Sequence, residues 1–191
     1  MGRAIHSMRP LNYFTLIHRY IAPQSPVYQV YLPHVTLVTA KALAIARRLG
    51  LPPERQRFIE EASMLHDIGI VGVAEYSTSS KPYICHAPIG REILEREGLP
   101  AHALVAERHI GLGLSKQEIL EHQLPVPPRD MLPKSLEEQI ICWADLFFGK
   151  NPKTVWIEKS LADVQRKVAR YGHRQEQQFA AWQAQFDCHP A

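Results

Sequence analysis

Four histidines are spaced so that their side chains could share one ligand inside the protein. They are His34, His66, His86 and His109, and each lies on the apolar face of a segment whose apolar residues recur at helical intervals. Such spacing predicts a helix with one face turned toward the core. A single histidine in that position is usually a hydrogen-bonded core residue. Four on consecutive helices favour a shared site, and neutral imidazoles that converge in an interior suit a transition metal.

Two aspartates strengthen this prediction because the sequence around each is apolar. Asp67 directly follows His66 in the segment MLHDIGI, where Gly69 is expected to let the backbone leave the helix sharply. Asp145 lies within IICWADLFF, in which all the other residues are apolar. A buried ionised carboxylate is costly without a compensating charge, or else its pKa rises and it becomes neutral. A metal cation would supply that charge, and a buried arginine or lysine partner is the alternative.

The elements that must position these residues all have helical period. Apolar stripes predict helices over 33–49, 53–66, 86–97 and 100–109, and capping boxes that begin at Ser115, Ser135 and Ser160 predict three more. No segment of useful length alternates with the period of a β-strand. The sequence therefore predicts an all-α fold, a single-domain helical bundle over residues 1–191. The apolar face of 174–187 is expected to pack on this domain or on a second subunit, which would make a homodimer.

Composition places the chain among ordinary reduced globular proteins. It has 191 residues, of which 46% are hydrophobic, and its formal net charge of +3 comes from 22 basic and 19 acidic residues. Three cysteines without a pattern argue against a disulfide framework. No apolar run approaches the ~18 residues of a membrane span. We therefore expect a cytoplasmic protein with no membrane partner, and the small charge also disfavours a nucleic-acid partner.

In this order, the four histidines and two aspartates resemble the ligand set of the HD-domain metal-dependent phosphohydrolase superfamily. The resemblance covers roughly residues 30–150 and includes the motif HDIG at 66–69. It implies an HD core over this range, with an N-terminal helix and C-terminal helices packed on it. It also implies one metal held by His34, His66, Asp67 and Asp145, and a second metal position at His86 and His109 with Asp67 bridging both ions.

The resemblance further implies a hydrolase whose catalytic residue is Asp67. Its cofactors would be one or two divalent transition-metal ions, with iron or manganese favoured and cobalt, nickel or zinc also suited to such ligands. Two ions about 3.5–4 Å apart can activate a hydroxide and polarise a phosphoryl oxygen. The expected substrate is a small molecule, a nucleotide or a related phosphoester or phosphoanhydride.

Two differences from the motifs of one branch of the superfamily argue against membership in that branch. The cyclic-dinucleotide phosphodiesterases carry a lysine directly after HDIG, where this chain has Ile70, and paired histidines where it has His109 and Ile110. Hydrolysis of cyclic di-GMP is therefore disfavoured, and the six ligand candidates look more similar to the di-iron hydrolases of diadenosine polyphosphates. Two alternatives stay open: an HD-fold di-iron oxygenase, and a nucleotide-binding regulatory module that keeps the metal site without turnover.

Phosphate-binding side chains should be cationic and close to the metal ligands. Lys81, in the loop before His86, and Arg108, beside His109, are the two candidates for substrate binding. Four further cations that the sequence does not rank are Arg91, Arg129, Lys134 and Lys150. Of the other histidines, His102 is about 10 Å along its helix from His109 and is expected at the rim of the cleft. The rest are expected on the surface: His6, His18, His122, His173 and His189.

Overall fold

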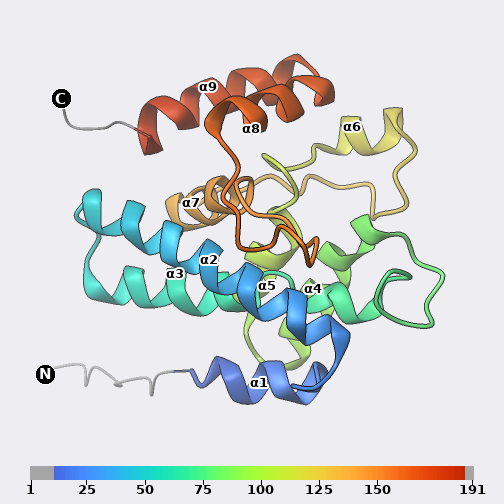
Figure 1. Ribbon diagram of the computed structural model, residues 1–191. Coiled ribbons are helices and arrows are strands. Elements are labelled where there is room, and N and C mark those ends of the chain that lie inside the picture. The colour runs from blue at the N-terminus through green and yellow to red at the C-terminus, as the bar shows by residue number, and fades with distance from the viewer. Residues whose placement is uncertain (1–10, 188–191) are drawn as a thin grey trace, which may run out of the picture.

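The computed structural model describes residues 11–187, and this part of the chain is mostly helical (Figure 1). Its α-helices are α1 (Tyr13–Tyr20), α2 (Pro26–Arg48), α3 (Pro53–Leu65), α4 (His86–Arg96), α5 (Pro100–Arg108), α6 (Lys116–Glu121), α7 (Leu136–Asp145), α8 (Leu161–Val168) and α9 (His173–Phe186). Three short 3₁₀ helices connect them: η1 (Ile68–Gly72), η2 (Tyr83–Cys85) and η3 (Ala169–Tyr171). Residues 11–187 contain no β-strand, only an isolated bridge between Leu114 and Met131. The all-α prediction is confirmed.

Local signals explain where the long helix α2 begins and ends. The Ser25 side chain accepts a hydrogen bond from the backbone N–H of Tyr28, and Pro26 occupies a first-turn position where a missing N–H loses no helical bond. The helix therefore begins before Pro33, where the sequence prediction placed its start, and continues through that proline. Gly50 follows its end with φ +66°, the left-handed conformation expected of a glycine that terminates a helix.

The glycine of the HDIG segment has a different role from the one expected. Gly69 lies in η1, and a Cβ atom there would stand 2.0 Å from the carbonyl oxygen of His86 and 2.4 Å from the backbone nitrogen of Gly90. Only a residue without a Cβ allows η1 and α4 to approach this closely. The requirement is therefore close packing of two backbones rather than a sharp exit from the helix, and it brings His86 next to the HDIG segment.

Two clusters of buried apolar side chains fill the interior. One draws mainly on α2, α3, α7, α8 and α9, and the other mainly on α1, α2, α4, α5 and η1. The rings of Phe179 and Phe186 in α9 lie 5.1 and 6.3 Å from the ring of Trp143 in α7, centroid to centroid. The apolar face of the tail therefore packs on α7 of the same chain. Within 11–187, no helix is both long and apolar enough to cross a membrane.

The helices form layers that enclose the central polar residues. In Figure 1, α1 lies at the lower end of the molecule and α8 and α9 at the upper end, with α2, α3, α4, α5 and α7 between them. The ends of α3, α4, α5 and α7 and the middle of α2 supply the residues of the candidate site.

Candidate metal centre

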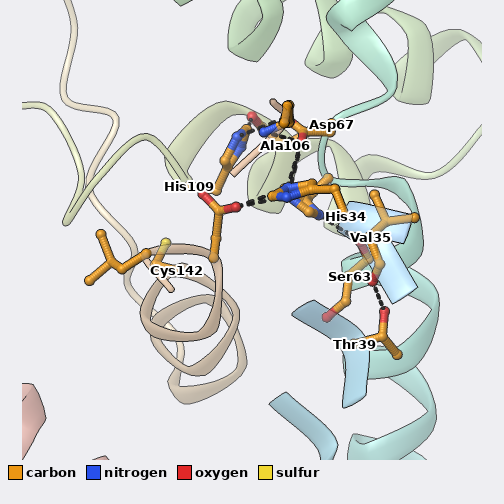
Figure 2. Close-up of polar contacts among 12 residues, drawn as sticks. His34, Val35, Thr39, Ser63, Asp67, Ala106, His109 and Cys142 are labelled. Atoms are coloured by element: carbon orange, nitrogen blue, oxygen red, sulfur yellow. Dashed lines mark hydrogen bonds and ion pairs between the residues drawn. The ribbon is translucent and has the colours of Figure 1, made fainter. Parts of the chain in front are cut away.

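The six metal-ligand candidates lie together between these helices. His34 lies within α2, and the others lie at helix ends: His66 and Asp67 just after α3, His86 at the start of α4, His109 just after α5, and Asp145 at the end of α7. All are buried except Asp145, whose side chain is 16% exposed. Figure 2 shows the side chains of His34, Asp67 and His109 pointing toward one another.

The first group of donor atoms, group 1, consists of His34, His66, Asp67 and Asp145. The Nε2 atom of His34 lies 3.0 Å from Asp67 Oδ2 and 3.0 Å from Asp145 Oδ1. The Nε2 atom of His66 lies 3.4 and 3.6 Å from the same two oxygens, and 3.3 Å from the Nε2 atom of His34. Donor atoms about 2.1 Å from one tetrahedral ion would be about 3.4 Å apart, so these spacings suit a shared transition metal.

The second group, group 2, uses the other oxygen of the same aspartate. The Nε2 atoms of His86 and His109 each lie 3.3 Å from Asp67 Oδ1 and 3.0 Å from each other. One carboxylate therefore presents one oxygen to each group. This arrangement fits a bridging ligand between two cations, the role that the resemblance implied for Asp67.

Backbone carbonyls orient three of the four imidazoles. The Nδ1 atoms of His66, His86 and His109 donate to the carbonyl oxygens three residues earlier, those of Ser63, Tyr83 and Ala106, at 2.6, 2.6 and 2.8 Å. A neutral imidazole that carries its proton on Nδ1 has a free lone pair on Nε2, which is the form a metal binds. At His86 and His109 these lone pairs face each other at 3.0 Å, so they need a cation between them.

The carboxylate oxygens also lack hydrogen-bond donors. Both oxygens of Asp67 and the Oδ1 atom of Asp145 are buried, and none accepts a hydrogen bond of good geometry from a described residue, although imidazoles and an ammonium group lie within ion-pair distance. Buried polar atoms are normally satisfied. Imidazole nitrogens and carboxylate oxygens together form a donor set for divalent transition metals. The residues present therefore fit one or two such ions.

The ammonium group belongs to Lys150, which the sequence could not rank above other cations. Its Nζ atom lies 2.6 Å from Asp67 Oδ2, and its side chain is only 13% exposed. Burial lowers the pKa of Lys150, but Asp67, Tyr83 and Asp145 more than reverse this effect and raise the pKa above its ordinary value. The signal that could have pointed to it is its place shortly after Asp145, in the turn that follows α7.

The sequence profile of the HD domain matches residues 31–148. The chain belongs to the HD-domain family. All six metal-ligand candidates lie inside the matched range, and the HD core is formed by α2 to α7. Lys150, α8 and α9 follow it in the chain.

Three relatives are similar to parts of this chain. An uncharacterized protein of Methanocaldococcus jannaschii is 39% identical over 109 residues, which cover 56% of this chain and 57% of that protein. A tRNA (cytidine(56)-2'-O)-methyltransferase of Thermoplasma volcanium is 29% identical over 72% of this chain and 39% of its own length. The enzyme of the same name from Picrophilus torridus is 31% identical over 59% of this chain and 29% of its own length. The chain thus matches between about a third and just over half of these relatives, and no solved structure matches it significantly.

Electrostatic coupling inside the HD site sets unusual protonation states. Burial would raise the pKa of Asp67, yet Lys150 and the imidazoles hold it well below its ordinary value. Burial lowers the pKa of His66, but Asp67 and Asp145 reverse this and raise it to about 10. At His86 burial prevails over the attraction of Asp67, and the pKa falls to about 3. Without metal, the two carboxylates are therefore balanced by Lys150 and a protonated His66, and metal binding would release the His66 proton.

A cavity of about 1060 Å³ opens onto the HD site. Four residues of the HD site line it, His86, His109, Asp145 and Lys150, and so does Tyr83. Ligand pockets in proteins are typically about 300–1,000 Å³. The cavity is therefore large enough for a ligand of nucleotide size that reaches the metal ligands.

The two substrate-binding candidates from the sequence do not line this cavity. Lys81 is exposed on the loop before η2. Arg108 lies beside His109 in sequence, but its Nη1 atom donates to both carboxylate oxygens of Glu138 at 3.1 Å. The guanidinium of Arg108 is therefore paired with a carboxylate outside the cavity.

The remaining cations and histidines that the sequence singled out are not among the metal ligands, although the exposed His122 lines the cavity. Arg91 and Arg129 both pair with Glu107, and Lys134 is exposed. His102 is buried against Phe58 and Glu61 and not at the rim of the cavity, where it was expected. The surface prediction holds for His18, His122 and His173, whereas His6 and His189 lie outside the described residues.

Proposed function

We propose that this chain is a metal-dependent phosphohydrolase that cleaves a nucleotide or a related phosphoester or phosphoanhydride. The observation that carries the proposal is the division of one buried carboxylate between two groups of imidazoles, since each Asp67 oxygen lies 3.0–3.4 Å from a pair of Nε2 atoms. Lys150 stands at the same carboxylate and lines the cavity. A phosphate group could therefore bind between the metal ligands and the ammonium group of Lys150.

The proposed cofactor is one or two divalent ions, with iron or manganese favoured. Group 1 would hold the first ion and group 2, with Asp67 shared, the second. Such ions polarise a phosphoryl oxygen and make water nucleophilic near neutral pH. The chain itself orients three of the four imidazoles through Nδ1–H donors to backbone carbonyls.

Lys150 is the side chain that we expect to bind the phosphate. Its ammonium has three donors and contacts only one of the two Asp67 oxygens, so it can also donate to a phosphate oxygen in the cavity. A hydrogen bond to a charged group contributes about 1.5–3 kcal/mol, which corresponds to roughly 10- to 100-fold in kcat/KM. Lys153, in the same loop but exposed, provides a matched control.

The substrates tested for phosphate release should include RNA, because two relatives are named for a reaction on tRNA. Those enzymes are more than twice as long as the part that this chain matches. We therefore do not propose methyl transfer for this chain. tRNA and short RNAs that end in phosphate belong beside nucleotides in the substrate panel.

The test is phosphate release by protein reconstituted with iron or with manganese, measured over nucleotides, p-nitrophenyl phosphate and RNA ends. We expect release from at least one substrate class, a loss of about 10- to 100-fold in Lys150→Met, and no loss in Lys153→Met. Metal content should stay the same in Lys150→Met, because this lysine is not a ligand. Oxygen consumption without phosphate release would instead favour the oxygenase, and nucleotide binding without either reaction would favour the regulatory module.

A further inference from the structure

The cavity has a second cationic region that the metal centre does not use. Lys159, Lys167 and Arg170 line it, and all three follow the HD match at 31–148. Lys159 precedes α8, Lys167 lies in the last turn of α8, and Arg170 lies in η3. The part of the chain that follows the HD match, and not the HD core, therefore supplies the positive charge of this region of the cavity.

These three cations have no carboxylate partner among the described residues. Lys159 is half-buried, and its Nζ atom contacts the carbonyl oxygen of Leu146 at 3.3 Å. No ion pair involves Lys167 or Arg170 within 11–187. By contrast, Arg166 in the same helix pairs with Asp163 and does not line the cavity.

The carboxylates that line the cavity do not neutralise these three cations. Burial lowers the pKa of Lys159, and repulsion from Lys167 and Lys150 lowers it further, against the attraction of Asp145. Two carboxylates line the cavity, Asp145 and Glu118, and both are occupied: Asp145 lies among the imidazoles and Glu118 pairs with Arg174. Unpaired cations that line one concave cavity attract an anion.

We propose that Lys159, Lys167 and Arg170 form an anion subsite for a second phosphate, so that the ligand of this cavity is a nucleotide with two separate phosphate groups. The inference rests on the proposed function, which places the first phosphate at the metal ligands. Apolar and aromatic residues, among them Tyr83, Leu114 and Phe148, line the same cavity and suit the base and sugar. Two phosphates on one nucleotide or at the end of an RNA share this chemistry.

The test compares the binding of adenosine 5′-monophosphate and adenosine 3′,5′-bisphosphate to the metal-loaded protein by calorimetry. We expect the bisphosphate to bind at least ~10-fold more tightly. The Lys167→Ala/Arg170→Ala double variant should reduce this ratio of dissociation constants to near one, whereas Arg166→Ala should keep it. Because these side chains are exposed, the variants should fold, and circular dichroism checks this.

Two further arms make the outcomes distinct. A 5′-phosphorylated adenine dinucleotide, measured alongside, separates the end of an RNA from a free nucleotide as the source of the second phosphate. Wild-type protein without preference for the bisphosphate, or a double variant that keeps the preference, would overturn the subsite. Phosphate release is measured in parallel. If the double variant loses the preference for the bisphosphate but the wild-type protein releases phosphate from no substrate, the anion subsite is kept and the proposed hydrolase is refuted.

Discussion

Replacing Gly69 by alanine should disturb the metal centre without changing any ligand. The new Cβ atom would stand 2.0 Å from the carbonyl oxygen of His86 and 2.4 Å from the nitrogen of Gly90, both backbone atoms of α4. Ordinary van der Waals contact begins near 3.4 Å. No change of rotamer relieves such a clash, so α4 and η1 must separate.

The size of the effect follows from this geometry. Overpacking typically costs about 1–3 kcal/mol, and a clash between backbones belongs at the upper end or beyond. In a chain of this size about 3 kcal/mol lowers the melting temperature by roughly 6–12 °C. Functional sites tolerate displacements of about 0.5 Å, so His86, now 3.3 Å from Asp67 Oδ1, should no longer share a cation with it.

Two other glycines provide a graded comparison. A Cβ atom at Gly72, also in η1, would meet only side-chain carbons of Ile89 at 3.0 Å, which can move, so Gly72→Ala should cost less than about 1 kcal/mol. At Gly90 the Cβ atom would lie 3.2 Å from Ala106 Cβ, and Gly90→Ala should fall between the two.

The assay is thermal unfolding, combined with metal content after reconstitution with excess manganese. Gly69→Ala should lose one of its bound ions and Gly72→Ala none. Equal melting temperatures and equal metal content in these two variants would refute the argument that close packing of η1 on α4 positions His86.

Three further predictions concern the ligands themselves. Asp67→Ala should bind less metal than His86→Ala, because it removes a donor from both groups; full metal content and turnover in Asp67→Ala would exclude the bridging role. Elemental analysis should find near two ions per chain, and near one in His86→Ala or His109→Ala; one ion per chain, unaffected by either substitution, would indicate a single-metal site. Since the pKa of His66 is about 10 without metal, a metal must displace its proton. Affinity should therefore rise with pH below that value, by up to about tenfold per pH unit; a chelator competition between about pH 6 and 8 that shows no change would contradict this.

Much of the fold and the choice of ligand candidates could be predicted from the sequence because the relevant signals are local. Helical period placed α3, α4 and α5 within a residue or two of their observed bounds, and the cap at Ser115 begins α6 with both hydrogen bonds of a capping box. The apolar surroundings of Asp145 marked it as a residue that faces the interior. Such patterns depend only on neighbours along the chain.

Relations between distant segments were decided only by the tertiary structure. Lys150 and Arg108 both come within five residues of a candidate ligand in sequence, yet Lys150 pairs with Asp67 and Arg108 with Glu138. The role of Gly69 likewise depends on α4, which comes later in the chain. Chain neighbours fix which way a helix face points, but ion pairs and close backbone approaches depend on how separate helices pack. A cation's partner is therefore settled by distances through space, which the local pattern does not contain.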